Sequence, residues 1–353
     1  MAHNAEQQSE ISESTNEVTS ELYPLQFTPI FQRYLWGGTR LAEILQKPIG
    51  CQSAAESWEI VDHQAHQSVV AQGPLAGTTL RELLDADGAA LVGASVMQAI
   101  TSVDQPLHLR GRFPLLLKYL DACQDLSVQV HPDDRFGRTL DPPDLGKTEA
   151  WYVMHADPGA RIYAGLKSGV TEAMFREAVA CGRAAETLHS FHARTGDCVF
   201  VPAGTMHAIG AGLLIAEIQQ ASNTTFRVDD WGRVDQNGNP RPLHLEQAIE
   251  VTNFERGPVQ PVRSGNDSFS IQTLVACEKF VLQRVPLVQS RTLGGDGQFH
   301  IIAGVQGSAV WVDSFGKHAL PKGGTVLLPA SMPPVEFAPT AEATVLIEIH
   351  VPS

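Results

Sequence analysis

The chain has 353 residues, which is enough for roughly two or three domains. Lys and Arg number 25 and Asp and Glu number 39, so the formal net charge is −14 at neutral pH, which argues against general binding of nucleic acid or anionic membranes. Hydrophobic residues make up 43% of the chain, which supplies a packed core and excludes a fully disordered protein. The 30 glycines and 22 prolines, many between short aliphatic runs, predict β-structure with many turns.

The N-terminus and the cysteines indicate where such a protein would work. Residues 1–20 are polar and acidic and lack the apolar stretch of a signal peptide, so we predict a disordered tail over residues 1–21. No apolar run approaches the roughly 20 residues that span a membrane. The five cysteines are odd in number, widely spaced and without a C-x-x-C pair, which argues against a disulfide scaffold or a thiolate zinc site. Together these features predict a cytoplasmic protein.

The first third of the chain mixes short helices and strands. The elements predicted there, in chain order, are a helix over Thr39–Gln46, strands over Ser57–Val61 and Ser68–Ala71, a helix from Thr79 to about Leu84, and a helical segment near Ala89–Ile100. Thr79 and Glu82 form a capping box, because their side chains can satisfy the free N–H groups at a helix start.

The rest of the chain is mostly strand-like. From Phe113 the apolar runs become short, and from Ser268 to Val351 we predict only strands and turns. Two helices interrupt this pattern, Thr171–Cys181 with Gly182 just beyond its end, and Pro242–Asn253.

A weak internal repeat indicates how these strands are organised. Gly196–Gly204 reads GDCVFVPAG and Gly323–Ser331 reads GGTVLLPAS, and each is a turn, a buried strand and a Pro-Ala turn. The repeat predicts a mainly β fold of two related jelly-roll barrels with a few attached α-helices. We place the first domain at residues 22–255 and a degenerate second β domain at 256–353, which has lost whatever the first carries.

The most informative strand is Leu126–Asp134, which reads LSVQVHPDD. Alternation along a strand places Ser127, Gln129 and His131 on one face and the two valines on the other. A Gln and a His that share a face just before a strand-ending proline are candidates for a site.

Two further motifs complete a candidate metal site. Lys147 and Glu149 are two residues apart and share a face of an extended chain, and the pattern G-D-x4-P-x-G-x2-H turns the chain back to present His207. The ligands on offer are the nitrogens of His131 and His207, the Glu149 carboxylate and, as the weakest, the Gln129 amide oxygen. Two imidazoles and a carboxylate without thiolate match a catalytic zinc, although Fe(II), Mn or Co also accept such ligands.

The spacing before His207 resembles the second conserved motif of cupins. Over roughly residues 22–350 the chain is similar to the short bacterial form of the type I mannose-6-phosphate isomerases. The stretches that carry this resemblance are Tyr34–Gly38, Ala55–Glu59, Phe113–Asp121, Leu126–Asp134, Gly146–Glu149, Pro202–Ile209, Glu217–Ser222, Thr225–Arg227 and Asp230–Arg233.

The resemblance implies roles for individual residues. The residues implied to hold one zinc ion per chain are His131, Glu149 and His207, with Gln129 adjoining them. Those implied to bind or approach the sugar phosphate are Ser127, Lys118 and Lys147, with Arg227 as the active-site arginine. The long-form members have an acidic residue near Asn223, so a catalytic role for Asn223 has no support here. The second barrel is implied to be structural, in keeping with the missing His after Pro329.

The implied reaction is the interconversion of mannose 6-phosphate and fructose 6-phosphate. It moves a proton between C1 and C2 through an enediol, while a metal stabilises the charge that develops on oxygen. Arg227 and Lys147 are the expected catalytic residues, since a guanidinium can hold anionic oxygens in a forked geometry. The general base stays open among Lys147, Glu217 and a metal-bound hydroxide.

Two other functions stay open: a metal-retaining cupin that binds a sugar phosphate without turnover, and another cupin metalloenzyme such as an Fe(II) oxygenase. The net charge does not exclude an anionic substrate, because charges beyond roughly 8 Å are largely screened. The cations Lys118, Lys147 and Arg227 are expected close to the metal site, where they would act on the substrate directly. We expect a sugar-phosphate ligand, no nucleic acid or membrane partner, and a monomer or weak homo-oligomer.

Overall fold

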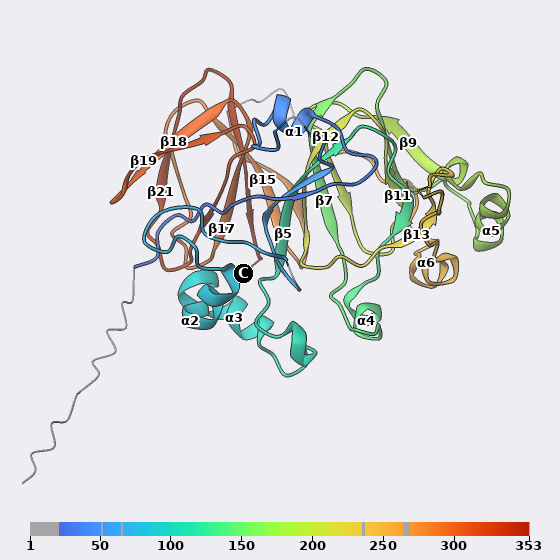
Figure 1. The fold of residues 1–353 in the computed structure, drawn as a ribbon, viewed down its shortest axis with the longest axis horizontal. Helices are drawn as coiled ribbons and strands as arrows, with labels where there is room; N and C mark the ends of the chain where they lie inside the picture. The colour runs from blue at the N-terminus through green and yellow to red at the C-terminus, as the bar shows by residue number, and fades with distance from the viewer. Residues whose placement is uncertain (1–20, 51, 65, 235–236, 264–268, 353) are drawn as a thin grey trace, which may run out of the picture.

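The computed structural model describes residues 21–50, 52–64, 66–234, 237–263 and 269–352. Apart from Glu21, the tail predicted from sequence lies outside these ranges. Within them the fold is mainly β, as the sequence predicts, with two groups of antiparallel sheets side by side and the helices at the periphery (Figure 1).

The first group of sheets forms the N-terminal barrel. Its strands are β1 (Ile30–Gln32), β2 (Glu56–Ile60), β5 (Leu115–Ala122), β6 (Val128–Val130), β7 (Glu149–Ala156), β8 (Arg161–Leu166), β9 (Leu188–His192), β10 (Cys198–Val201), β11 (His207–Ile209), β12 (Leu213–Gln220) and β13 (Phe226–Asp229), and a separate pair, β3 (Asp62–His63) and β4 (His66–Gln67), lies beside them. A six-stranded sheet, β1-β2-β5-β12-β7-β10, packs against a five-stranded sheet, β13-β6-β11-β8-β9.

The second group forms the C-terminal barrel, drawn in orange and red in Figure 1. Its strands are β14 (Gln272–Ala276), β15 (Val281–Leu287), β16 (Arg291–Leu293), β17 (His300–Gln306), β18 (Ser308–Asp313), β19 (Gly316–Pro321), β20 (Thr325–Leu328), β21 (Val335–Pro339) and β22 (Thr344–His350). They make the sheets β14-β15-β22-β17-β20 and β16-β21-β18-β19. An apolar cluster that includes Ile302, Trp311 and Leu346 fills this barrel.

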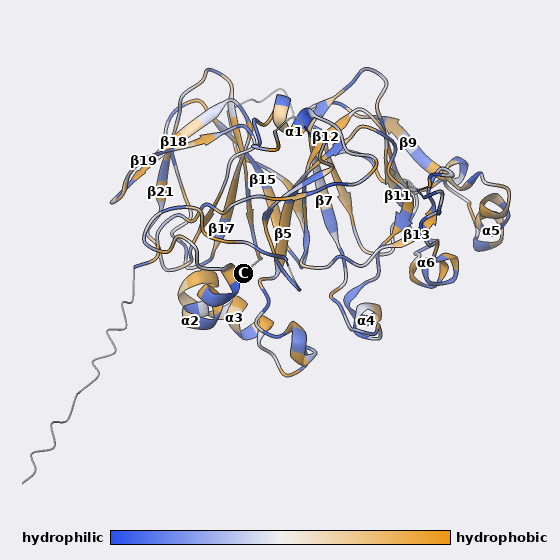
Figure 2. Cartoon of the chain, viewed as in Figure 1, coloured by the Kyte–Doolittle hydropathy of each residue, from blue (hydrophilic) through white to orange (hydrophobic). Residues whose placement is uncertain are grey.

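Strands β5, β7 and β12 have both faces buried, and this decides which way their charged residues point. Successive side chains alternate between the two faces of a strand. Leu117 and Ile218 face outward into the large apolar cluster between the barrels. Figure 2 colours much of β5 and β17, which contribute residues to this cluster, as hydrophobic. Their neighbours Lys118 and Glu217 face inward and lie opposite each other on β5 and β12. The same alternation turns Glu149 of β7 into the first barrel.

The predicted helices are present and differ from the predictions mainly at their ends. The helices are α1 (Arg40–Glu43), α2 (Leu80–Val92), α3 (Ala94–Ile100), α4 (Asp134–Gly137), α5 (Glu172–Ala180) and α6 (Leu245–Val251). Helix α4 is not among the predictions, and the strand predicted over Ser68–Ala71 is reduced to isolated bridges at Val69 and Val70. The capping box at Thr79 and Glu82 is present, but α2 continues past the predicted end near Leu84 to Val92, with a kink at Asp87. The separation from α3 comes at Gly93, whose φ of 91° favours glycine.

The segment that connects the barrels still pairs with the first barrel at Val262, beyond the boundary predicted at residues 255/256. Val262 pairs with Cys198 of β10, and near the N-terminus Leu25 pairs with Leu327 of β20. We keep residues 255/256 as a proposed division between two β units that share the apolar cluster between them.

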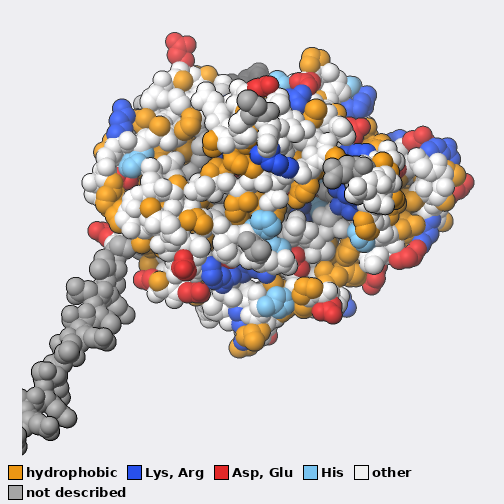
Figure 3. Space-filling view, viewed as in Figure 1, with side chains coloured by type: hydrophobic (Ala, Val, Ile, Leu, Met, Phe, Trp, Pro, Cys, Tyr) orange, Lys and Arg blue, Asp and Glu red, His pale blue; other side chains and the backbone are white. Residues whose placement is uncertain are grey.

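The surface carries acidic and basic side chains spread over the face seen in Figure 3, with small scattered hydrophobic patches. Among the described residues, no helix combines the length and apolar character needed to cross a membrane.

Candidate active site

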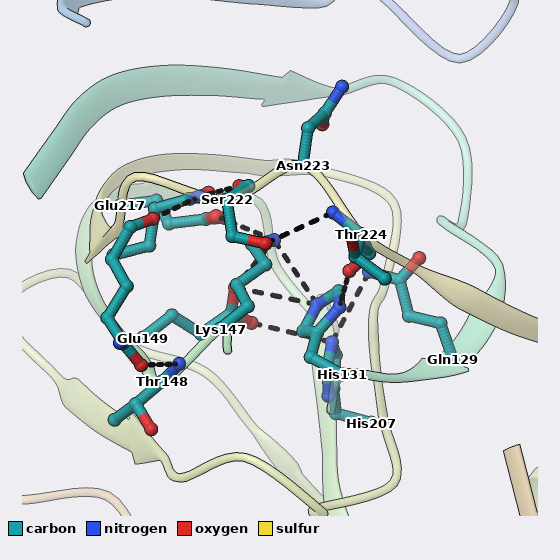
Figure 4. Close-up of polar contacts among 12 residues, drawn as sticks. Gln129, His131, Lys147, Thr148, Glu149, His207, Glu217, Ser222, Asn223 and Thr224 are labelled. Atoms are coloured by element: carbon teal, nitrogen blue, oxygen red, sulfur yellow. Dashed lines mark hydrogen bonds and ion pairs between the residues drawn. The ribbon is translucent and has the colours of Figure 1, made fainter. Parts of the chain in front are cut away.

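Three buried side chains converge inside the first barrel. His131 directly follows β6, while Glu149 and His207 are the first residues of β7 and β11. The Nε2 atoms of His131 and His207 lie 3.6 Å and 3.4 Å from the two Glu149 carboxylate oxygens. One ligand atom from each residue falls within 4.8 Å of the others, and this is the only such His/Cys/Asp/Glu group among the described residues (Figure 4).

The hydrogen bonds of the two imidazoles occupy Nδ1 and leave Nε2 available to bind a metal. Nδ1 of His131 lies 2.9 Å from the Thr224 carbonyl oxygen and Nδ1 of His207 lies 2.9 Å from that of Thr205. A carbonyl only accepts, so each Nδ1 carries the hydrogen and each Nε2 presents a lone pair toward Glu149. Burial lowers the pKa of His131, and it lowers the pKa of His207 to about 4. Two neutral imidazoles and a carboxylate fit a divalent cation.

Gln129 adjoins this triad, although its amide oxygen faces away from it. The Gln129 amide nitrogen lies 3.3 Å from Nε2 of His207, while its oxygen accepts a 3.0 Å hydrogen bond from the Ser127 hydroxyl. The shared face predicted for Ser127, Gln129 and His131 is therefore present. A role for Gln129 as fourth ligand stays a prediction.

Buried charges of alternating sign lead away from the triad. The Lys147 ammonium lies 2.8 Å from Glu149 and 3.4 Å from Glu217, and the Lys118 ammonium lies 3.4 Å from both Glu217 and Glu56. Burial alone would raise the pKa of Glu217, but Lys118 and Lys147 outweigh it and lower that pKa to about 2. Burial, together with repulsion from Glu217, raises the pKa of Glu149. Glu217 is therefore an ionised carboxylate that holds two ammonium groups in place.

A cavity of about 270 Å³ opens onto these residues. Its lining includes every predicted site residue except the histidines His131 and His207. The lining residues without a prior assignment are Tyr34, Trp36, Glu56, Leu120, Leu126, Trp151, Ile209, Thr225 and Arg241. Tyr34, Trp36 and Glu56 lie in stretches that carry the family resemblance, but only the fold shows that they face the cavity.

Arg227 reaches the cavity from β13. Its Nε donates to the Ser127 hydroxyl over 3.3 Å and its Nη1 donates to the Pro242 carbonyl over 3.3 Å. No carboxylate among the described residues forms an ion pair with Arg227, in contrast to Lys118 and Lys147. Burial lowers the pKa of Arg227, and the neighbouring Arg241 and Arg233 add to this effect.

Asp144 is a positioning residue that the sequence does not reveal. Its carboxylate accepts hydrogen bonds from the Ser222 hydroxyl, the Asn223 amide and the Thr224 hydroxyl, at 3.0, 3.2 and 2.9 Å. This fixes the Thr224 carbonyl that orients His131. Asn223 lines the cavity, and it joins this network through its backbone N–H, which donates to Asp144.

Comparison with known proteins is consistent with this geometry. Residues 24–154 match the family model for the catalytic domain of phosphomannose isomerase type I. The chain is 34% identical over 329 residues to mannose-6-phosphate isomerase ManA of Bacillus subtilis, covering 91% of this chain and 98% of that protein. It is 33% identical over 315 residues to mannose-6-phosphate isomerase of Streptococcus mutans, covering 89% and 95%.

Solved structures agree with this result. The crystal structure of the mannose 6-phosphate isomerase from Bacillus subtilis matches with a TM-score of 0.80 and 31% identity over 93% of this chain and 99% of that one. A mannose 6-phosphate isomerase bound with zinc and yttrium shares the fold, with a TM-score of 0.70 and 18% identity over 94% and 100% of the two chains. The chain therefore belongs to the type I mannose-6-phosphate isomerase family of enzymes.

Proposed function

We propose that this enzyme interconverts D-mannose 6-phosphate and D-fructose 6-phosphate through an enediol, with one divalent metal per chain. The observation that carries the proposal is the buried triad of His131, Glu149 and His207 beside a cavity whose lining supplies Lys147 and Arg227. A metal site alone would suit many cupins. Cationic side chains next to it suit a phosphorylated substrate and a reaction that develops negative charge on oxygen.

His131, Glu149 and His207 would hold the metal. Two imidazoles and a carboxylate, with no thiolate, make zinc the first candidate. When bound, the metal supplies a Lewis acid that stabilises negative charge on the O1 and O2 oxygens of the sugar. The Thr224 and Thr205 carbonyls keep the two imidazole rings oriented for it.

We assign the proton transfer between C1 and C2 to Lys147. As an ammonium it first has to release one of its own protons, and the resulting amine then takes the proton from one carbon and returns it to the other. Its ammonium nitrogen lies 2.8 Å from Glu149 and 3.2 Å from Nε2 of His131, on the cavity lining beside the triad. Glu217, the other side-chain candidate for the base, is poorly suited because its pKa of about 2 makes its carboxylate a weak proton acceptor at neutral pH. Glu217 instead holds Lys147 and Lys118 on either side of it.

The substrate phosphate fits the other part of the cavity. Lys118 and Lys147 each contact two carboxylates, whereas Arg227 forms no ion pair among the described residues and donates to Ser127. We therefore assign the phosphate to Arg227 and Ser127. Lys118, predicted from the resemblance to lie near the phosphate, is assigned here to holding Glu217 and Glu56.

The test is to incubate purified protein with mannose 6-phosphate and follow fructose 6-phosphate, with and without a chelator, alongside elemental analysis of the metal. We expect turnover that the chelator abolishes and that added zinc restores. Arg227→Ala should reduce turnover and leave the metal content unchanged. If metal-replete protein binds the sugar phosphate without forming product, the chain is a binding protein and the isomerase proposal is wrong.

We further propose that the enzyme works in cytoplasmic carbohydrate metabolism as a monomer or weak homo-oligomer. The odd number of cysteines and the four described ones, which are all unpaired, support a reducing compartment. Size-exclusion chromatography with light scattering measures the oligomeric state.

A further inference from the structure

We propose that Arg241 is a second phosphate-binding residue, which acts together with Arg227 on the phosphate of the substrate. The inference rests on the proposed function and concerns the same cavity. Arg241 lines the cavity beside the triad, and with Tyr34 and Trp36 it also lines an adjacent outer groove of about 440 Å³. It therefore stands on the wall between the reacting end of the cavity and solvent.

Asp230 holds the Arg241 side chain in a forked ion pair. Nε of Arg241 donates to one carboxylate oxygen over 2.7 Å, and a terminal nitrogen donates to the other. Asp230 is 6% exposed and also pairs with Arg233, so it cannot swing away without leaving a buried charge unpaired. A guanidinium carries five N–H donors, and this pair uses two of them. Asp230 therefore orients Arg241 without saturating it.

The backbone around Arg241 is fixed to the strand that carries Arg227. The His244 amide donates to the Arg227 carbonyl over 2.7 Å, and the Arg227 amide donates to Nδ1 of His244 over 3.3 Å. The Arg227 guanidinium itself contacts the carbonyl of Pro242, the residue next to Arg241. The two guanidiniums are thus held near each other on one wall.

Two neighbouring guanidiniums repel each other unless an anion lies between or beside them. The charged groups that act on Arg227 are Arg241, Arg233 and Asp230, so the four residues together carry three positive charges and one negative, a net +2. A phosphate ester carries about two negative charges at neutral pH and accepts forked hydrogen bonds from arginine. This excess positive charge distinguishes the wall from the lysines beside the triad, whose charges three carboxylates offset.

The Gln129 side chain separates the two ends of the cavity. Ser127, which contacts Arg227, donates to the Gln129 amide oxygen over 3.0 Å. The Gln129 amide nitrogen lies 3.3 Å from Nε2 of His207, so a single amide group lies between Ser127 and the triad. An extended sugar phosphate can therefore place C1 and C2 near the triad and its phosphate near Ser127, Arg227 and Arg241.

The experiment compares Arg241→Met with Arg33→Met. Arg33 lines only the outer groove, so its replacement removes the same charge from the same region without touching the cavity. Calorimetry with sorbitol 6-phosphate, which has no carbonyl to isomerise, measures phosphate-dependent binding in the metal-loaded enzyme. We expect Arg241→Met to weaken binding and raise KM for mannose 6-phosphate by about 10- to 100-fold, with an unchanged metal content. Arg33→Met should stay within about twofold of wild type.

Two further variants separate phosphate binding from a structural role. Arg241→Ala should recover kcat/KM when guanidinium ion is added at low millimolar concentration, and Asp230→Asn should raise KM while leaving kcat nearly unchanged. Equal binding by Arg241→Met and Arg33→Met contradicts the inference, as does a loss that guanidinium does not restore. Wild-type protein that binds sorbitol 6-phosphate through Arg241 but forms no fructose 6-phosphate would refute the proposed isomerase and leave this inference standing.

Discussion

The two barrels share a strand order, apart from the additional edge strands β1 and β13 of the first, but among the described residues the His/Glu group that could hold a metal lies in the first barrel. β10 and β20 occupy matching edge positions, next to β7 and β17, and each is followed by a Pro-Ala turn. Five residues after the proline, the first barrel has His207 and the second has Pro334. Proline has no side-chain ligand atom. The second barrel therefore lacks the counterpart of His207, one of the three proposed metal ligands of the first barrel.

Strand register extends the comparison beyond that position. Glu149 lies opposite the last residue of β10, and His300 lies opposite the last residue of β20. Two residues further along, Glu217 and Glu348 occupy corresponding places on the central strands β12 and β22. Lys118 lies opposite Glu217, whereas the neutral Gln283 lies opposite Glu348. The second barrel therefore has a polar cluster at a corresponding place, but with different charges.

The imidazole in the polar cluster of the second barrel is occupied by ion pairs within the cluster. His300 lies between Glu348, 2.8 Å from Nδ1, and Asp296, 3.0 Å from Nε2. Both imidazole nitrogens are used by carboxylates, whereas His131 and His207 each bond a carbonyl through Nδ1 and keep Nε2 for a ligand. Buried His and Glu residues inside a barrel can therefore form a metal site only when the imidazole nitrogens keep free lone pairs that point at one another beside a cavity.

The largest effect should come from removing a metal ligand in the first barrel. We expect His207→Ala to lose the metal and to reduce kcat/KM by more than about 10⁴-fold, because both the Lewis acid and the triad geometry are lost. Elemental analysis and the isomerase assay measure the two effects together. Full activity in metal-free His207→Ala would show that the triad is not the reacting centre.

Lys147 and Lys118 should differ although both contact Glu217. Lys147→Met should reduce kcat by about 10²- to 10⁴-fold, as expected for loss of a proton-transfer group. Lys118→Met should reduce it less, since Lys118 acts through Glu217 and Glu56. Steady-state kinetics on both variants, with metal content as control, make the comparison. A larger loss in Lys118→Met would reverse the assignment.

His300→Gln should alter stability rather than activity. Burial lowers the His300 pKa, but the pairs with Glu348 and Asp296 outweigh burial and raise it. A raised folded-state pKa stabilises the protein below the unfolded value of about 6.5, and this contribution is lost as pH rises through the folded-state pKa. Chemical unfolding should therefore show a loss of about 3 kcal/mol at pH 6 and a smaller loss at pH 9. A substantial change in KM would mean that the two barrels are coupled.

Restoring a histidine to the second barrel should have the smallest effect. Pro334→His supplies one imidazole where the other groups are already paired, so we expect elemental analysis to find no second metal per chain. A gain of one bound metal would show that the second barrel lacks only this ligand.

Much of the fold and the convergence of His131, Glu149 and His207 could be predicted from sequence because they depend on local patterns. Period-2 alternation places Gln129 and His131 on one face, and the Gly-Asp…His spacing describes a turn, strand and return that the structure contains. The capping box at Thr79 likewise depends on residues three positions apart.

Residues brought in from distant strands could not be predicted in this way. Asp144 joins the site through hydrogen bonds to residues about 80 positions away. Arg241 is placed by Asp230 and His244, and Glu56 meets Lys118 across a separation of 62 residues. Local patterns do not distinguish Asp144 and Arg241 from solvated surface charges. Glu56 lies in a stretch that carries the family resemblance, but its contact with Lys118 appears only once the sheets are assembled.

Metal titration tests the central claim most directly. Metal-depleted enzyme should recover mannose 6-phosphate isomerase activity in proportion to added zinc and reach a plateau at one equivalent per chain, while His207→Ala recovers none. A plateau at two equivalents, or full activity before any metal is added, would contradict the claim that one metal held by the first barrel carries the reaction.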